Sequence, residues 1–282
     1  MNVTIPEKEK LKKRTIVIYI IAAIICVLAV VVVVESQVLG NDVVNQLFGI
    51  NKLIKRTEQE EASLKTNFEN LFDNTLENAN NTEYQKIYNT KDVIFTNYKK
   101  EEVLDSSEVN VNLPFINLKD KEAQEFNQEI ENIFQAKTEE IINQKSENTI
   151  YTVKYKAVVQ NNILSLIIYS DLKQGASPQR VIIQTFNYDL EENKKLSLSD
   201  VANIYNYYTS DIQKKINDDI KEEQQKTDDL KQLGYNVFSR DLESDIYKVE
   251  NVTEFFVYNN NIYIIFAYGN DQITSEMDLV II

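Results

Sequence analysis

Residues 151–190, YTVKYKAVVQNNILSLIIYSDLKQGASPQRVIIQTFNYDL, decide the fold of this chain. Apolar and polar side chains alternate through the first part of the stretch, which is the period of a half-buried β-strand. The Gln-Asn-Asn triplet at 160–162 predicts a turn. Two further strands are predicted at 163–172 and 179–190, joined by the loop 173–178. We therefore expect antiparallel strands at the centre of the protein.

The residues before this block predict two strands and a helix. Val93 begins one alternating segment, and 109–113 forms another that Pro114 closes. Residues 117–144 carry apolar side chains at helical spacing, and Asn117 is a suitable N-cap.

The residues after the block continue the same alternation of elements. Residues 196–200 predict a short strand that leads into a helix carrying apolar side chains from Val201 to Ile220. The segment 254–269 predicts a hairpin around its Asn triplet, and the chain ends in a last strand. The fold class is therefore α+β, with helices packed on an antiparallel β-sheet.

An uncharged apolar run near the N-terminus predicts a membrane anchor. Residues 15–34, TIVIYIIAAIICVLAVVVVV, are long enough to cross a bilayer as a helix. Five basic residues within the preceding 1–14 orient that tail toward the cytoplasm. We expect a single-pass signal anchor in the cell membrane, with the bulk of the chain extracellular. The alternative, a cleaved signal peptide, has a shorter apolar core and a small-residue cleavage site, which this sequence lacks.

Residues 41–80 have apolar side chains spaced alternately four and three apart, a helical pattern similar to a coiled coil. Two readings follow: a juxtamembrane stalk that forms a homodimer, or a helix that lies on the folded region. The resulting organisation is a cytoplasmic tail, a transmembrane helix, a juxtamembrane helical stalk and two α+β subdomains, at residues 1–14, 15–34, 35–85, 86–147 and 148–282.

Composition excludes several classes of function. The net charge of the chain is −14. The tail carries five basic residues and two glutamates, a net charge of +3, so the part of the chain expected outside the cell has a net charge near −17. Such a surface repels nucleic acid and attracts cationic partners. The single cysteine lies in the apolar run, so no disulfide is expected outside. The chain has no histidine, which excludes Ser–His–Asp catalysis and His-ligated zinc.

No motif predicts a catalytic, cofactor or metal site. Five scattered glycines cannot form a phosphate-binding loop, and no calcium loop is present, so no cofactor or metal is expected. Asp171, Asp189 and Asp200 are the candidate carboxylates for acid–base chemistry, but their places at strand ends and caps favour structural roles.

Two further groups of side chains have a functional and a structural reading. Lys154, Lys156 and Ser165 lie in strands without the spacing of a Ser–Lys nucleophile. A sugar-binding platform would have to use a tyrosine cluster, and core packing is the simpler reading of it. The cluster comprises Tyr205, Tyr207 and Tyr208. The ligand-binding residues are unknown at this stage.

Two segments carry a resemblance to a known ectodomain pair. Thr185–Leu190 and Lys194–Val201 read T-ϕ-N-ϕ-D-L and K-x-ϕ-x-L-x-D-ϕ, where ϕ is apolar. Upstream, Leu113–Asn117 is followed by the helical motif Phe126-Asn127-x-x-Ile130. This arrangement resembles the extracytoplasmic region of RsiV-type anti-sigma factors and the N-terminal region of PdaC-type peptidoglycan deacetylases, without the sigma-binding or deacetylase parts.

The resemblance implies a non-catalytic, ligand-binding ectodomain on the cell envelope of Gram-positive bacteria. The ligand it implies is a cell-wall component or a cationic protein such as lysozyme. We therefore expect an extracytoplasmic binding or sensor protein. The alternatives are a structural partner that self-associates through the 41–80 helix, and a cell-wall hydrolase that uses carboxylates alone.

Overall fold

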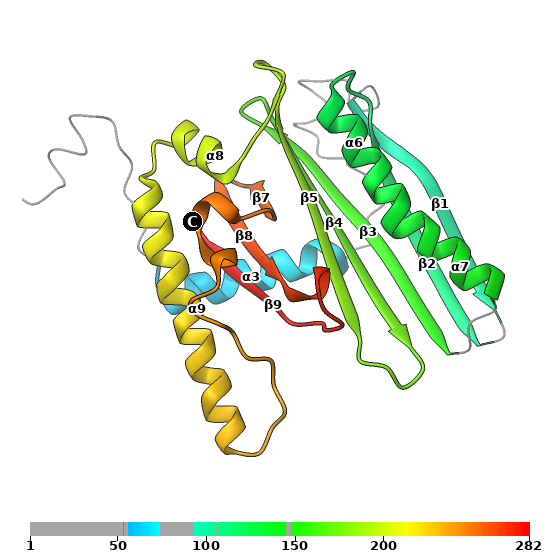
Figure 1. Ribbon diagram of the computed structural model, residues 1–282. Helices are drawn as coiled ribbons and strands as arrows, with labels where there is room; N and C mark the ends of the chain where they lie inside the picture. The colour runs from blue at the N-terminus through cyan, green and yellow to red at the C-terminus, as the bar shows by residue number, and fades with distance from the viewer. Residues whose placement is uncertain (1–52, 54–55, 74–92, 105, 145–147) are drawn as a thin grey trace, which may run out of the picture. The chain divides into compact units, whose positions relative to one another are not determined.

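The computed structural model of the protein describes residues 53, 56–73, 93–104, 106–144 and 148–282 (Figure 1). The predicted tail and transmembrane helix, and most of the predicted stalk, lie outside these residues. None of the described helices is both long and apolar enough to cross a membrane. The described residues form one compact unit, apart from Tyr205–Tyr208, which fall outside it.

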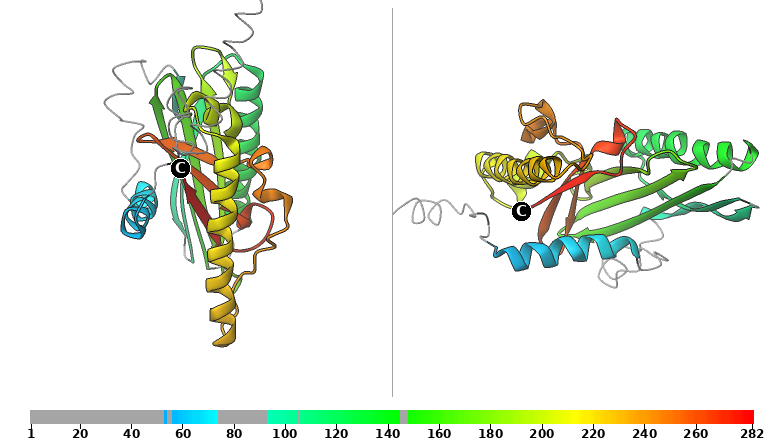
Figure 2. Two further views of the ribbon diagram at one scale, coloured as in Figure 1. Left: turned by 90° about the vertical axis from the view of Figure 1, so that its left-hand side faces the viewer. Right: turned by 90° about the horizontal axis from the view of Figure 1, so that it is seen from below.

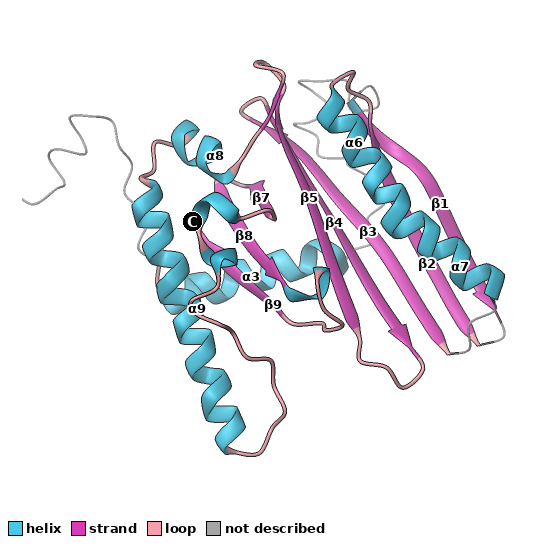
Figure 3. Cartoon of the chain, in the orientation of Figure 1, coloured by secondary structure: helices cyan, strands magenta, loops and turns pink. Residues whose placement is uncertain are grey.

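The centre of the fold is a six-stranded sheet whose strands follow one another in sequence order (Figure 3). They are β1 (Ile94–Leu104), β2 (Ser107–Ile116), β3 (Thr149–Gln160), β4 (Ile163–Gln174), β5 (Arg180–Asp189) and β6 (Lys194–Lys195). The three strands predicted within 151–190 are confirmed. Asn161 and Asn162 join β3 to β4 with positive φ angles of 51° and 62°, as a tight two-residue hairpin requires.

One pair of strands corrects the expected purely antiparallel sheet. β2 and β3 run parallel, with Ser107 opposite Thr149 and Val111 opposite Val153, while the other neighbours are antiparallel. The sheet is therefore mixed. A parallel pair cannot be joined by a tight turn and needs a long crossover, which helices supply here. The boundary expected between two subdomains, at 147/148, falls between these two paired strands.

The crossover from β2 to β3 consists of α6 (Lys121–Ile130), the π-helical turn η1 (Glu131–Gln135) and α7 (Ala136–Gln144). Asp120 caps α6, because its carboxylate accepts hydrogen bonds from the N–H groups of Glu122 (2.8 Å) and Ala123 (3.2 Å). The predicted cap, Asn117, instead donates its backbone N–H to Val93 O beside β1. The helix thus begins at Lys121, four residues after the start of the predicted range 117–144.

Both faces of the six-stranded sheet are covered, because successive side chains of a strand point to opposite sides. Figure 2 shows the α6–α7 run on one face and α3 (Glu58–Asp73) on the other. The face toward α6 and α7 packs Phe126, Ile130 and Phe134 against alternate residues of β3, β4 and β5. The α+β class is therefore shown, with helices packed against a mixed sheet.

The opposite face carries a second, three-stranded antiparallel sheet: β7 (Phe255–Tyr258), β8 (Asn261–Ala267) and β9 (Met277–Ile281). The predicted C-terminal hairpin is confirmed, with Asn259 and Asn260 at positive φ in its turn. Phe256, Tyr263 and Ile265 pack against apolar side chains of β4 and β5. The two sheets thus share one hydrophobic layer.

Polar side chains of the large sheet complete the hydrogen bonding of β7. Asn187 Nδ2 donates to Phe255 O (2.7 Å), and Val257 N donates to Ser165 Oγ (2.8 Å). Ser165 Oγ in turn donates to Asn187 Oδ1, and Phe255 N donates to Thr185 Oγ1 (3.1 Å). The side of β7 that faces away from β8 is therefore paired without a further strand.

The α3 helix is the described part of the predicted stalk. Thr57 and Glu60 form a capping box, with Thr57 N donating to Glu60 Oε2 (2.8 Å) and Glu60 N to Thr57 Oγ1 (3.3 Å). Phe68 and Phe72 are buried with the three-stranded sheet, and Lys154 Nζ donates to Phe72 O (2.6 Å). In this part of the chain the helix lies on the folded region, which is the second of the two readings. Self-association through 41–80 stays a prediction.

The helix predicted from Val201 to Ile220 is two helices, α8 (Leu198–Ile204) and α9 (Thr209–Gln232). Residues 196–200 do not form the predicted short strand, because β6 ends at Lys195 and α8 begins at Leu198. Between the helices, Asn206 has a φ of 55°, which an α-helix cannot accommodate. The rings of Tyr205 and Tyr207 stack on each other with centroids 6.3 Å apart.

Candidate functional site

Two of the three candidate aspartates fix local backbone structure. Asp189 accepts the N–H groups of Glu191 (2.8 Å) and Glu192 (2.9 Å) and so closes the turn after β5. Asp200 accepts hydrogen bonds from Lys194 Nζ (2.6 Å) and Ser197 N (2.9 Å). The bonds from Lys194 and Ser197 lower the pKa of Asp200 to about 2. Asp189 therefore fixes a turn, and Asp200 fixes the start of α8 through its bonds to Ser197.

The third aspartate lies far from the turn after β5. Asp171 accepts a hydrogen bond from Gln179 Nε2 (2.6 Å). In the β4–β5 register, Asp171 lies opposite Val181, whereas Asp189 lies opposite Ile163. Eight residues of β4 separate these two positions, or about 26 Å at about 3.3 Å per residue. A glycosidase pair needs carboxyl groups about 5–10 Å apart, so Asp171 and Asp189 do not form one.

Two of the three side chains considered for Ser–Lys chemistry form hydrogen bonds elsewhere in the fold. Lys154 binds the C-terminal carbonyl of α3, and Ser165 binds Asn187 and β7. Burial lowers the pKa of Lys156, which projects from the same strand as Lys154. Among the described residues, no hydrogen bond joins either lysine to the hydroxyl of Ser165 as a base to a nucleophile.

The motifs behind the resemblance hold the fold together. Asn127 of α6 pairs with the backbone of Ile116, donating to its carbonyl and accepting from its N–H at 2.9 Å each. Asn187 of the T-ϕ-N-ϕ-D-L motif binds β7 through Phe255 O. A buried Asn can satisfy both backbone groups of a strand end, which explains an amide at these positions. The residues of these motifs therefore stabilise the fold, and they do not identify the ligand-binding residues.

A cavity of about 610 Å³ lies between α6, β5 and the segment that leads into β7. Its apolar lining comes from Phe126, Ile133, Ile246, Val252, Ile265 and Phe266. Its charged lining comes from Glu129, Lys195, Glu254 and Asp271. A pocket of this size with apolar walls and a few polar groups is typical of small-ligand sites. This cavity is the candidate functional site.

Glu254 is the unusual residue of the cavity. Its side chain is buried, with 8% of the residue exposed, and Oε2 has no hydrogen-bond partner among the described residues. Burial raises the pKa of Glu254 to about 7, with hydrogen bonds from Thr185 opposing the rise. Within the described ranges, no group of three acidic side chains is arranged to hold a metal ion. A carboxyl group that changes its charge near neutral pH therefore lines the cavity.

Sequence reasoning missed this site. Glu254 stands directly before the apolar run Phe255–Tyr258, where an acidic residue is usually a solvated end of a strand. Part of the lining comes from α6, β5 and β6, more than fifty residues earlier in the chain. An acidic residue directly before a fully apolar strand is the one local signal of this site, but that pattern does not show whether the acidic side chain is buried or exposed.

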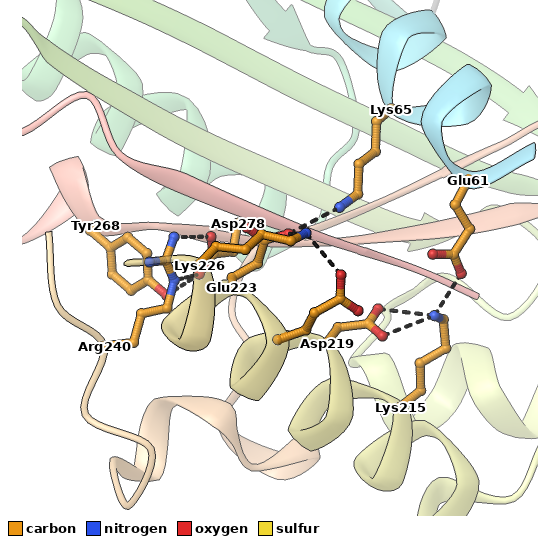
Figure 4. Close-up of polar contacts among 10 residues, drawn as sticks. Glu61, Lys65, Lys215, Asp219, Glu223, Lys226, Arg240, Tyr268 and Asp278 are labelled. Carbon is orange, nitrogen blue, oxygen red and sulfur yellow. Dashed lines mark hydrogen bonds and ion pairs between the residues drawn. The ribbon is translucent and has the colours of Figure 1, made fainter. Parts of the chain in front are cut away.

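A buried ion pair fixes the wall of the cavity that Tyr268 provides (Figure 4). Arg240 binds both carboxylate oxygens of Asp278 at 2.5 Å, and its Nη1 donates to Thr227 Oγ1 (2.6 Å). Tyr268 Oη donates to Asp278 Oδ2 (2.6 Å), and burial together with this carboxylate raises the pKa of Tyr268. The loop after α9 is thus attached to β9 and to the lining of the site.

Ion pairs also attach α3 to α9, as Figure 4 shows. Lys215 binds Glu61 (2.8 Å) and Asp219 (2.9 Å), and Lys65 lies 3.6 Å from Glu223. The side chain of Lys215 is 19% exposed, so this bridge is partly shielded from water. These ion pairs therefore hold α3 against α9.

No protein-family model matches the sequence, and no curated protein matches it. A solved DUF3298 family protein from Pseudomonas aeruginosa PAO1 is 12% identical with a TM-score of 0.36, over 67% of this chain and 87% of that chain. A member of the same family from Bacteroides fragilis NCTC 9343 is 11% identical with a TM-score of 0.37, over 67% and 89%. Likenesses this weak carry no argument, and the RsiV-type and PdaC-type resemblance stays a prediction.

Proposed function

We propose that this protein is a membrane-anchored, extracytoplasmic binding or sensor protein of the bacterial cell envelope, without catalytic activity. The apolar run 15–34 and the basic residues before it support the anchor and its orientation. The acidic exterior supports a cationic partner, because charges of opposite sign accelerate encounter. The proposed ligand is a cell-wall component or a cationic protein such as lysozyme.

The observation that carries the proposal is the cavity lined by Glu254. It offers a buried carboxyl group and apolar walls in one pocket that is open to solvent, which suits recognition of a specific group. The aspartates that suggested acid–base chemistry are engaged in a turn, a cap and a bond to Gln179. Binding therefore accounts for more of the arrangement than hydrolysis does.

Co-sedimentation tests the proposal. Full-length protein in nonionic detergent micelles is mixed with purified Gram-positive cell walls, and separately with immobilised lysozyme. We expect retention on at least one of them that exceeds retention on cytochrome c, a cationic protein of similar charge. Equal retention on cytochrome c, or none on walls and lysozyme, would contradict the proposal. Protease access to a C-terminal tag in intact cells tests the orientation, since a protected tag refutes an outside location.

A carboxylate hydrolase remains a second candidate because of one observation. Glu129 lines the same cavity as Glu254, and the negative charge of Glu129 contributes to the raised pKa of Glu254. Two carboxyl groups that line one cavity are the arrangement that glycosidases use. Release of soluble fragments from purified cell walls by wild-type protein, lost in Glu254→Gln, would favour this candidate over the binding protein.

A further inference from the structure

Two independent observations meet at Glu254. The first is the cavity of about 610 Å³ that this residue lines. The second is the buried carboxyl oxygen Oε2, which has no hydrogen-bond partner among the described residues. A buried polar atom without a partner is costly, so native proteins rarely keep one without a reason. A ligand that supplies a donor would satisfy Oε2 where the cavity lining moves to admit that donor, because the atom itself is closed off from water in this structure.

The charges around the cavity favour a cation. Glu129 faces it from α6 and Asp271 from the residue after η4 (Tyr268–Asn270), whereas Lys195 of β6 is the basic side chain in the lining. Lys195 Nζ lies over the ring of Phe186, 5.7 Å from its centroid. The acidic side chains of the lining thus outnumber the basic one, and a cationic group entering the cavity is attracted.

The shape of the free carboxyl group selects among cations. A guanidinium binds best to two carboxylate oxygens at once, as Arg240 does at Asp278. Glu254 has one oxygen without a partner, and hydrogen bonds from Thr185 already reach the carboxyl group. A primary ammonium is a compact charge that needs one such acceptor. The walls contributed by Phe126, Ile133 and Ile265 suit an aliphatic stem behind it.

We propose that the cavity binds a primary ammonium group on an aliphatic stem, such as a lysine side chain of a cationic partner, with Glu254 as its counter-ion. This assignment rests on the proposed binding function and names the chemical group that the site recognises. On binding, the Glu254 carboxyl group releases its proton to solvent, and the ammonium keeps its own.

Binding is therefore expected to depend on pH. The pKa of Glu254 is about 7 in the free protein, raised by burial and by Glu129 and lowered by Thr185 and Lys195. At pH 5 only about 1% of this carboxyl group is ionised, so affinity should be about 100-fold weaker there than at pH 8. The ammonium of a lysine side chain, with a pKa of about 10.4, stays charged throughout this range.

Calorimetric titration of the full-length protein in detergent micelles tests the proposal. The probe is Nα-acetyl-lysine methylamide, and Nα-acetyl-norleucine methylamide is its neutral counterpart of similar shape. We expect the lysine derivative to bind at pH 8 at least tenfold more tightly than the norleucine derivative. Titration at pH 6 in buffers of different ionisation enthalpy should show release of about 0.9 proton per ligand bound.

Variants separate the site from the general acidity of the protein. Glu254→Gln should weaken binding of the lysine derivative at least tenfold and remove its pH dependence. The matched control is Glu250→Gln, which removes an equal charge from an exposed position four residues earlier and should change affinity less than twofold. The wild-type comparisons of probe and pH need no variant, so a folding defect in Glu254→Gln would leave them decisive.

Two results would overturn the proposal: equal binding of both probes to wild-type protein, or equal loss of affinity in Glu254→Gln and Glu250→Gln. Failure of this ammonium-binding proposal can be distinguished from failure of the proposed binding function. Retention on cell walls or lysozyme that Glu254→Gln leaves unchanged supports that function while refuting this site. Binding of the lysine derivative without retention on either partner supports the site and refutes the named ligands.

Discussion

Replacing Glu254 by Gln should stabilise the protein at alkaline pH, although the residue lines the candidate site. The pKa of Glu254 is raised from 4.5 to about 7 on folding, because burial disfavours the charged form. Below pH 4.5 the Glu254 carboxyl group is protonated in both the folded and the unfolded state, so it does not change folding stability there. As the pH rises to 7, the unfolded state loses the proton first, so folding stability falls. This rise in pKa corresponds to about 3 kcal/mol of stability, which is fully lost above pH 7.

Urea denaturation followed by tyrosine fluorescence, which the absence of tryptophan permits, measures this effect. Gln resembles the protonated carboxyl group, so wild type and Glu254→Gln should be similar in stability at pH 4.5. At pH 8 the variant should be more stable by about 3 kcal/mol, a large share of the roughly 5–15 kcal/mol of a typical domain. Glu250→Gln, the exposed control, should follow wild type at both values. A difference between wild type and Glu254→Gln that does not change with pH would refute the reasoning.

Three further predictions concern stability. Asn187→Ala should lower the free energy of unfolding by about 2–5 kcal/mol, because the buried atoms Phe255 O and Ser165 Oγ both lose a hydrogen bond to Asn187. A urea midpoint equal to that of wild type would contradict this. Arg240→Met leaves Asp278 buried without its cationic partner and should cost about 3–5 kcal/mol in thermal unfolding, whereas adding Asp278→Asn should restore part of the loss. The pKa of Asp200 is lowered from 3.8 to about 2, so its stabilisation is present above pH 3.8 and disappears as the pH falls toward 2. Asp200→Asn should lack that acid-dependent component, and an unchanged profile of midpoint against pH would argue against the bonds described.

Local patterns predicted the strands well because burial on one face leaves a period of two in the sequence. The segments 163–172 and 179–190 coincide with β4 and β5 to within two residues at each end. The Asn pairs in the turns were also readable, because Asn adopts positive φ more easily than most residues. These features depend on neighbouring residues alone.

Features that depend on distant residues were not predicted. The parallel pairing of β2 with β3 follows from where the α6–α7 crossover places the chain, and the alternation of side chains along one strand does not show the direction of its neighbour. The break at 205–208 is hidden because Ile204 and Ile212 keep helical spacing across it. The cavity is assembled from α6, β5, β6 and the C-terminal segments, so its lining has no local signature.

The side-chain bonds from Ser165, Thr185 and Asn187 to β7 have a consequence for how the protein opens. If the C-terminal hairpin detached alone, the backbone of β7 and these three side chains would lose the hydrogen bonds that they make to each other between the two sheets. Partial unfolding of that kind is unfavourable, so the hairpin and the large sheet should behave as one cooperative unit. Amide hydrogen exchange of Val257 should therefore be as slow as that of the central strand β4.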